Sequence, residues 1–379
     1  MGNFTKDFYA QASYFLKNDS VDLQVSVKGG MCTAAYTYEG KQKFPYFIAP
    51  WWNEAPYLDQ HPIMQVMRGD YFCFPFGANV NPYNNVEYKI HGRTANECWD
   101  FKKISRKGSK SSLHLTMDLT PEDGEVEKIL TLEEGSPIVY TDHVIKNFSG
   151  PSSFGNHPNI QCSAETGVAM LDMSPPLTGY SAPFPIDVPE NMGYSILKPG
   201  EEIKDRTKVP TVYGDTIDLT KYPIPRGYED VAMFISNPDL EYSFTAVTDP
   251  KKGFLYFQLK DPKVLASTLL WMPNNGRYSE PMNRRVIGSI GVEEVTGYFF
   301  YGRKESVDEN FISKKGYTTF LQFDPNEEKH IKLISGTIPI RNSFQGVKDI
   351  VRKNDTEITI LGRGGERIDV PCNLNFLFE

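Results

Sequence analysis

Apolar and polar residues alternate along several stretches of the chain, and this period of two is typical of β-strands with one buried face. The clearest stretch is 113–119, where Leu113, Leu115, Met117 and Leu119 alternate with polar residues. Other segments of similar character are bounded by turn-forming residues: 125–134, 137–147, 241–249, 253–260 and 330–340. The pattern predicts an all-β protein built from many antiparallel strands.

Helix signals are scarce, because 27 prolines and 30 glycines interrupt most stretches that would sustain an apolar helical face. One short helix is predicted at 342–351, where Phe344, Val347 and Ile350 would share a face. The glycine-rich segment 361–367 lacks the spacing and context of a phosphate-binding loop. We therefore predict a hairpin turn there.

The most loop-like part of the chain is the proline-rich region at about 174–227. A linker between two domains would have this composition. However, the strands predicted on either side have the same character, and the composition does not change across the region. We therefore interpret it as an excursion from a single domain that spans 1–379.

Composition and charge limit the partners. With 40% apolar and 13% aromatic residues, the chain can build a substantial core. A net charge of -8, with no run of Lys or Arg, argues against nucleic acid or an anionic membrane as the main partner. A small, neutral or modestly charged molecule fits better.

The 5 cysteines are widely spaced and include no CxxC pair, so neither a disulfide framework nor a zinc site is expected. The first residues lack a charged region followed by an apolar core, and no stretch of about 18 apolar residues occurs. These features favour a cytoplasmic protein, although a periplasmic protein trimmed of its export signal would have the same sequence features.

Two neighbouring segments carry candidate binding groups. Arg68 precedes a dense run of aromatic residues. The N–H donors of its planar guanidinium would suit substrate hydroxyls. The alternative is a surface ion pair with Asp70. The segment 88–99, YKIHGRTANECW, places His91 before a glycine and before Arg93. A lone histidine usually packs against its surroundings, so its role depends on chemical partners elsewhere in the chain.

Such partners occur in two later segments. Asn156 and His157 precede Pro158, which forces His157 toward an extended geometry that can present its ring to a cavity. In 291–297, the adjacent Glu293 and Glu294 would point to opposite faces of a strand, one inward and one toward water. An inward Glu has a raised pKa, which suits a general base. A loop histidine and two exposed glutamates are the alternatives.

Other catalytic signatures are missing. No GxSxG sequence indicates a serine nucleophile, and the Cys and His residues form no recognisable local motif. Acid/base chemistry by His and Glu therefore remains.

Taken in order, these residues make the chain resemble the galactose mutarotase-like superfamily, the relatives of aldose 1-epimerase. The resemblance rests on the order and separation of short motifs between residues 68 and 297: Arg68, the His91-Gly92 pair with Trp99 after it, LEEGSPIVYTDHVIKN, Asn156-His157 and GVEEVTG. It implies a large twisted β-sandwich (a supersandwich) whose concave face binds sugar without a cofactor. We expect no metal ion, although His91, His157 and Glu293 are of ligand types that suit a divalent metal, which their spacing neither supports nor excludes.

The resemblance also implies roles for individual residues. His157 matches the histidine that acts as general acid at the ring oxygen, and Glu293 matches the general base. His91 matches a ligand to a substrate oxygen, and Arg68 matches a sugar-binding arginine. Arg93 has no firm counterpart but would reach a hydroxyl or a carboxylate.

The chain also departs from the family pattern. Pro158-Asn159-Ile160 stands where the family continues with Tyr-Phe-Asn. The family's base segment is Glu-Thr followed downstream by Pro-Asp, and this chain has Glu293-Glu294-Val295-Thr296 in its place. The catalytic residue types are thus kept better than the specificity residues. We expect segment 270–285, which includes Trp271, to form the chain's own rim over the pocket, with Trp271 and Asn156 contacting substrate.

The leading functional prediction is an isomerase that interconverts sugar anomers, as a monomer or homodimer. A carboxylate would take the proton of the C1 hydroxyl while an imidazolium, facing it across the ring, protonates the ring oxygen. One alternative is a lyase or hydrolase acting on an oxidised or acidic glycoside. Another is a sugar-binding protein without turnover.

Overall fold

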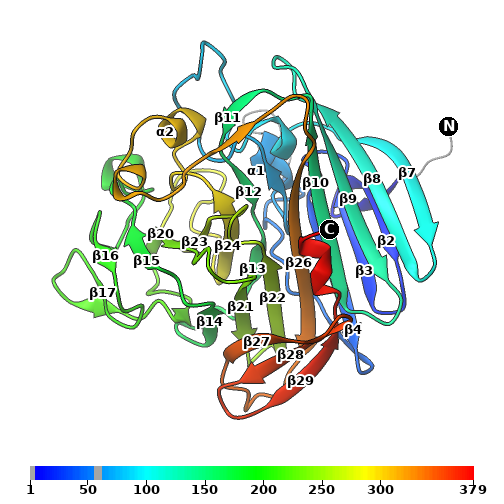
Figure 1. Ribbon diagram of the computed structural model, residues 1–379. Coiled ribbons are helices and arrows are strands. Elements are labelled where there is room, and N and C mark those ends of the chain that lie inside the picture. The colour runs from blue at the N-terminus through cyan, green and yellow to red at the C-terminus, as the bar shows by residue number, and fades with distance from the viewer. Residues whose placement is uncertain (1–4, 55–61) are drawn as a thin grey trace.

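A computed structural model describes residues 5–54 and 62–379, and its strands form stacked antiparallel sheets (Figure 1). The largest sheet has nine strands within the described residues. In spatial order these are β19 (Lys221–Tyr222), β14 (Ala169–Met173), β21 (Ser243–Asp249), β22 (Phe254–Lys260), β26 (Lys329–Pro339), β10 (Ile138–Lys146), β9 (Glu125–Glu133), β8 (Lys110–Asp118) and β7 (Asp100–Lys107).

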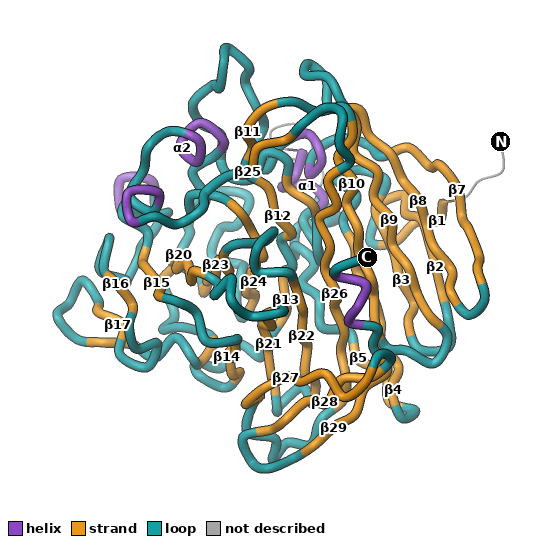
Figure 2. The backbone as a smooth tube through the Cα atoms, in the orientation of Figure 1, coloured by secondary structure: helices purple, strands orange, loops and turns teal. Residues whose placement is uncertain are grey.

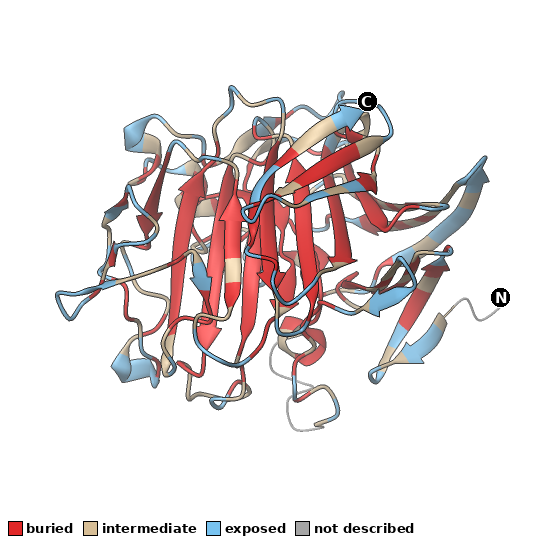
Figure 3. Ribbon diagram, turned by 90° about the horizontal axis from the view of Figure 1, so that it is seen from below, coloured by how far each residue is buried: buried red, intermediate tan, exposed pale blue. Residues whose placement is uncertain are grey.

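The second large sheet positions the candidate site. In spatial order it contains β16 (Glu202–Ile203), β15 (Thr178–Ser181), β20 (Tyr228–Ile235), β23 (Ser267–Asn274), β24 (Ser289–Thr296), β12 (Phe154–Asn156) and β6 (Phe72–Cys73). An eighth strand, β13 (Asn159–Gln161), pairs with β24 beyond the end of β12. The central strands β20, β23 and β24 are buried along almost their whole length. Buried strands fill the middle of the molecule, and exposed residues lie mostly in the outer loops and edge strands (Figure 3).

Smaller sheets flank these two. One consists of β1 (Thr5–Phe8), β2 (Gln11–Lys17), β3 (Val21–Ser26), β4 (Cys32–Tyr38) and β5 (Lys41–Lys43). Another consists of β27 (Val347–Asn354), β28 (Glu357–Gly362) and β29 (Arg367–Pro371). Two pairs complete the set: β11 (Gly150–Ser152) with β25 (Leu321–Phe323), and β17 (Val209–Pro210) with β18 (Thr216–Ile217).

Helices are few and short in the described residues (Figure 2). They are α1 (Pro62–Val66), α2 (Arg303–Val307) and the 3₁₀ turns Arg93–Ala95, Pro189–Asn191, Ser313–Lys315 and Leu374–Leu377. None of these helices has the length and apolar character needed to cross a lipid bilayer.

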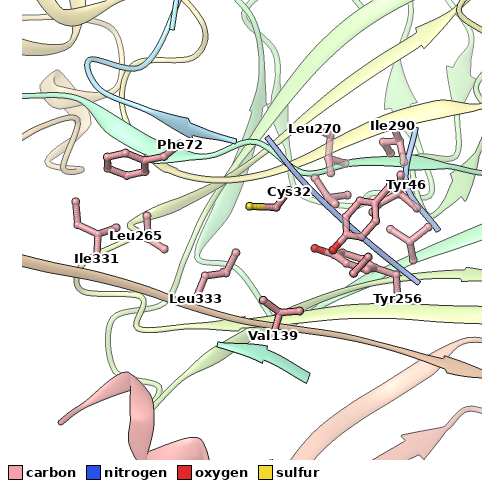
Figure 4. Packing of buried hydrophobic residues seen from close by; sticks show 14 of the residues in the cluster. Cys32, Tyr46, Phe72, Val139, Tyr256, Leu265, Leu270, Ile290, Ile331 and Leu333 are labelled. Atoms are coloured by element: carbon pink, nitrogen blue, oxygen red, sulfur yellow. The ribbon is translucent and has the colours of Figure 1, made fainter. Parts of the chain in front are cut away.

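The main core lies between the two large sheets. Leu270 of β23 and Ile290 of β24 meet Val139, Tyr256 and Leu333 from the nine-stranded sheet (Figure 4). Because side chains alternate along a strand, every second residue of β23 and β24 enters this core. The residues between them face the opposite side of the eight-stranded sheet.

The alternating segments were predicted correctly. All of them coincide with strands of the nine-stranded sheet, within a few residues at each end. In β8, Leu113, Leu115 and Met117 are buried while the residues between them are partly exposed. The segment 361–367 is the hairpin turn between β28 and β29. The all-β, antiparallel sandwich prediction is thus confirmed.

The predicted helix at 342–351 is wrong. Residues from Val347 onward form strand β27, which pairs with β28. Phe344, Val347 and Ile350 are buried together against apolar side chains of β22 and β26. Their spacing fits a helical face, but pairing with a neighbouring strand determines the local structure, as often happens with short apolar runs.

The proline-rich region contributes to both large sheets. Its strand β15 pairs with β20 in the eight-stranded sheet, and β19 pairs with β14 in the nine-stranded sheet. Between β15 and β19 the chain forms loops that contain the short strands β16, β17 and β18, and these loops also reach the candidate site described below.

Candidate active site

His157 and Glu293 meet on the face of the eight-stranded sheet that points away from the main core. Strands β12 and β13 both pair with β24, and residues 157–158 link these two strands beside Glu293. The backbone N–H of His157 donates to the carbonyl of Tyr71 at 2.9 Å, and Pro158 accepts from Val292 at 3.0 Å. This link interrupts the strand and turns the imidazole toward the carboxyl group of Glu293.

The two side chains are in direct contact. Nε2 of His157 lies 3.2 Å from Oε1 of Glu293. The imidazole stacks on Tyr71, with ring centroids 4.5 Å apart. The Trp271 ring forms a T-shaped contact with the imidazole, with centroids 5.9 Å apart. We expected the two groups to face each other across the width of a sugar ring; instead they are adjacent, and packing holds the imidazole in place.

Burial determines the protonation of this pair. The apolar surroundings raise the pKa of Glu293 well above its usual range. Burial, together with the nearby His91, lowers the pKa of His157 well below its usual value. Both shifts favour the uncharged forms, in which the Glu293 carboxyl group is a proton donor and the imidazole a proton acceptor.

His91 lies at right angles to His157, with ring centroids 5.0 Å apart. The backbone N–H of Gly77 donates to Nδ1 of His91 at 3.3 Å, so the ring proton is on Nε2. Burial lowers the pKa of His91 to about 3, and the ring is neutral at ordinary pH. His91 can therefore donate one hydrogen bond from Nε2.

The backbone around His91 explains the His-Gly pair. His91 has φ +57°, a left-handed conformation that is uncommon for a residue with a side chain, and Gly92 follows with φ +73°. A Cβ atom on Gly92 would lie 2.0 Å from the carbonyl oxygen of Phe74. Only glycine fits this position, and the tight turn directs His91 toward His157.

These side chains line a cavity of about 250 Å³. His91, His157 and Glu293 lie in its wall together with Trp271 and Arg277. Most of the remaining wall is aliphatic. The structure thus brings four of the predicted site residues, His91, His157, Glu293 and Trp271, to one place, and segment 270–285 contributes to the wall as expected.

Arg277 is held by two carboxyl groups. Its guanidinium lies 2.5 Å from Oε1 of Glu229 and 3.3 Å from Oδ1 of Asp187, and Trp271 Nε1 donates to the same Glu229 oxygen at 2.8 Å. Burial raises the pKa of Glu229 to about 7 and also raises that of Asp187. Near neutral pH these carboxyl groups offset the positive charge of Arg277.

Sequence reasoning did not find Glu229 or Asp187. Glu229 stands on β20, beside Asp230, so it belongs to the same kind of adjacent carboxylate pair as Glu293 and Glu294. That signal was available in the sequence. Asp187 lies in the proline-rich region, and only the folded chain reveals its contact with Arg277.

Arg68 does not reach the cavity. Its guanidinium is buried and donates to the carbonyls of Val66 at 2.9 Å, Phe8 at 2.8 Å and Tyr9 at 3.1 Å. These bonds connect the hairpin of β1 and β2 to the segment that follows α1. Each of its three nitrogens thus donates to a backbone carbonyl rather than to the cavity.

Arg93 and Asn156 also lie outside the cavity lining. The Arg93 guanidinium is 3.3 Å from the carbonyl of Thr120 and 3.4 Å from Asp118, at the surface. Asn156 is opposite Glu294 on β24, so its side chain enters the main core, on the other face of the sheet from His157. Alternation along the strand therefore separates these two neighbours.

The expectation that one glutamate of the pair meets water is wrong. Glu294 is fully buried in the main core, where it forms an ion pair with Lys260. Thr245 and Gln258 each donate to Oε1 of Glu294 at 2.6 Å. Glu294 thus faces the main core, where it pairs with Lys260, and Glu293 faces the cavity on the other side of the sheet.

In the part of the chain that the structure describes, no three His, Cys, Asp or Glu side chains are arranged to hold a metal ion.

Comparison with known proteins finds similarity only at the level of structure. No protein-family model matches the sequence, and no curated protein does. A solved structure from Synechocystis sp. PCC 6803 superposes with a TM-score of 0.55 at 16% identity, covering 89% of this chain and 99% of the other.

Two further solved structures carry functional descriptions. A galactose mutarotase related enzyme from Lactobacillus acidophilus has a TM-score of 0.54 at 10% identity, covering 87% of this chain and 98% of the other. A galactose mutarotase-like protein from Clostridium acetobutylicum has a TM-score of 0.55 at 14% identity, covering 89% and 98%. This chain therefore has the galactose mutarotase-like fold.

Proposed function

We propose that the protein is a carbohydrate isomerase that interconverts sugar anomers, with His157 and Glu293 as its acid/base pair. The observation that carries this proposal is the 3.2 Å contact between their side chains in the cavity wall, where burial favours the uncharged form of each group. The fold agrees with it, since one structural neighbour is described as a galactose mutarotase related enzyme.

The geometry suits the reaction. In a pyranose the anomeric hydroxyl and the ring oxygen are bonded to the same carbon, so the groups that exchange protons with them must be close together. Burial favours the uncharged pair, in which the proton is on Glu293. Once this proton passes to His157 across the 3.2 Å contact, the Glu293 carboxylate accepts the hydroxyl proton as the imidazolium protonates the ring oxygen. The bond between C1 and the ring oxygen then breaks, and the open aldehyde rotates about C1–C2. Ring closure on the other face reverses both transfers.

His91 would assist as a neutral donor. Its Nε2 proton can bind a sugar oxygen without adding a charge beside the imidazolium. The second oxygen of Glu293, Oε2, has no hydrogen-bond partner among the described residues. It is thus available to a ligand hydroxyl.

A lyase or hydrolase acting on an acidic glycoside is less well supported. Such an enzyme needs a cationic group for the substrate carboxylate. Of the described residues in the cavity wall, Arg277 is the permanent cation, and Glu229 and Asp187 already offset its charge.

The test is proton NMR of anomer interconversion in freshly dissolved aldoses. We expect the wild type to accelerate it, and His157→Ala and Glu293→Gln to lose about 100- to 10,000-fold in kcat/KM, the usual contribution of general acid/base groups. The exposed residues His330 and Glu327 offer matched controls, His330→Ala and Glu327→Gln, which should retain full activity.

The outcomes separate the alternatives. Sugar binding that survives in Glu293→Gln, with no acceleration by the wild type, would mean a binding protein and would refute the isomerase. New reducing ends or an unsaturated product from a glycoside would indicate hydrolysis or elimination instead.

A further inference from the structure

The cavity wall has two chemically different parts. The polar part consists of His91, His157, Glu293 and Arg277, together with Tyr71 and Trp271, whose aromatic side chains each carry one polar group. The rest of the described wall is mainly aliphatic and thioether surface, and includes Ile63, Met64, Met67, Ile186, Leu269 and Met282. Such a wall offers neither donors nor acceptors to a ligand.

The polar part can serve only some of the hydroxyl groups of a sugar. In the proposed reaction, His157 and Glu293 are engaged by the ring oxygen and the anomeric hydroxyl, and His91 donates one further hydrogen bond. Arg277 Nη2 already donates to Glu229, and its Nε lies 3.3 Å from Asp187, so only part of its guanidinium remains for a ligand. A fully hydroxylated hexose would therefore bury other hydroxyls against aliphatic side chains, and each unpaired hydroxyl weakens binding roughly tenfold.

The size of the cavity suits a ligand of one ring. Its volume of about 250 Å³ is below the roughly 300–1,000 Å³ of sites for drug-sized ligands. Charge also favours a neutral ligand. The permanent cation in the described wall is Arg277, and the carboxyl groups of Glu229 and Asp187 already pair with it. A single uncharged ring with one polar edge and one apolar edge fits both limits.

We propose that the cavity selects an uncharged aldopyranose that lacks a hydroxyl remote from its anomeric carbon, with 6-deoxyhexoses as the simplest members. This substrate class rests on the proposed isomerase function of the same site. A methyl group in place of the C6 hydroxymethyl buries no unpaired oxygen. Met64, Met67 and Met282 can adjust to it, because unbranched thioether side chains fill irregular space.

The experiment compares sugars that differ by one oxygen atom: D-fucose with D-galactose, L-rhamnose with L-mannose, and 6-deoxy-D-glucose with D-glucose. Anomer interconversion gives kcat/KM, and calorimetry gives Kd for the same pairs. We expect the deoxy member of at least one pair to have a kcat/KM about tenfold higher and a correspondingly lower Kd.

The two measurements separate this inference from the proposed function. Equal values within every pair, or a preference for the hydroxylated member, would overturn the deoxy-sugar inference while leaving an active isomerase intact. Tighter binding of deoxy sugars without any turnover would refute the isomerase but support the inference. Absence of binding to every sugar at millimolar concentration would overturn both.

A wall variant tests the physical cause. Met282 is buried in the cavity wall, and Met282→Gln replaces its thioether with an amide of similar size that can bond a hydroxyl. The preference for the deoxy sugar should fall several-fold in Met282→Gln and persist in the apolar control Met282→Leu. An unchanged preference in folded Met282→Gln would overturn the assignment of this wall.

Discussion

At the scale of single residues, the site depends on keeping ionisable groups uncharged. Burial raises the pKa of Glu293 and lowers the pKa values of His157 and His91. Such shifts destabilise the fold wherever the unfolded chain ionises the group and the folded chain does not: above pH 4.5 for Glu293 and below pH 6.5 for the two histidines. The strain of His91, with φ +57°, is a second cost at the same place. Two predictions follow from these costs.

The first concerns Glu293→Gln. Below pH 4.5 the carboxyl group is protonated in both the folded and the unfolded chain. As the pH rises above that value, the unfolded chain ionises while the folded chain keeps the proton, so the wild type loses up to about 1.4 kcal/mol per pH unit until the folded-state pKa is reached. Gln cannot ionise, so the variant should be inactive but increasingly more stable than the wild type.

Urea unfolding at pH 5 and pH 8 measures this difference. The exposed variant Glu327→Gln serves as control and should show no such trend. A gap between Glu293→Gln and the wild type that stays constant with pH would mean that Glu293 is ionised in the folded protein.

The second concerns Gly92→Ala. The left-handed backbone alone costs a residue with a side chain about 1–2 kcal/mol, and the 2.0 Å approach of the new Cβ to Phe74 adds to that. Gly108 has φ +60° with nothing within 4 Å of its position, so Gly108→Ala measures the backbone cost by itself. Gly92→Ala should lose more stability, and also kcat/KM, because the turn moves His91. Equal losses in both variants, without loss of activity, would contradict this account.

At the scale of elements, the sequence predicts what depends on local pattern and fails where distant segments meet. Strands such as β8 alternate clearly because one face is buried and the other is partly exposed. In β27, three apolar residues fit a helical face equally well, and the partner strand that decides the structure is not visible in the local sequence. His157 and Glu293 were found because the residue types in each segment are unusual. Asp187 and Arg277, by contrast, become neighbours only through the order of strands and loops.

Arg68 also shows that contacts between distant segments are not visible in the local sequence, and it gives a third prediction. It matches a sugar-binding arginine in the resemblance, yet its guanidinium bonds three backbone carbonyls and connects the β1–β2 hairpin to the chain after α1. Arg68→Met leaves the buried carbonyl of Val66 without this partner, at about 1–3 kcal/mol, and removes the bonds to the partly buried carbonyls of Phe8 and Tyr9. We expect a large loss of stability, measured by urea unfolding, with KM for sugars unchanged where the variant folds.

Arg93→Met is the matched control. Its guanidinium makes only longer, partly exposed contacts, and such pairs contribute about 0–1 kcal/mol. The control should therefore behave as the wild type. Weaker sugar binding at unchanged stability in Arg68→Met would restore the sugar-binding role.

At the scale of the whole molecule, the two large sheets share a buried polar network within an apolar core. Lys260 on β22 pairs with Glu294 on β24, and Lys260 donates to the carbonyl of Ser267 on β23 at 2.8 Å. Thr268 of β23 donates to Oε2 of Glu294 at 2.7 Å. The network therefore connects β22 of the nine-stranded sheet to β23 and β24 of the eight-stranded sheet. Because β24 also carries Glu293, the network helps to position the candidate site.

The fourth prediction tests this coupling by a double-mutant cycle. Removing one partner of a buried ion pair leaves an uncompensated charge and typically costs about 3–5 kcal/mol, whereas replacing both by apolar residues is often nearly neutral. Lys260→Met and Glu294→Leu should each destabilise strongly, and the double variant should recover most of the loss in urea unfolding. Because β24 positions both glutamates, the single variants should also lower kcat/KM, and the double variant should restore part of it. Additive losses in the double variant would show that the pair does not couple the two sheets, and that the position of Glu293 depends on the apolar core alone.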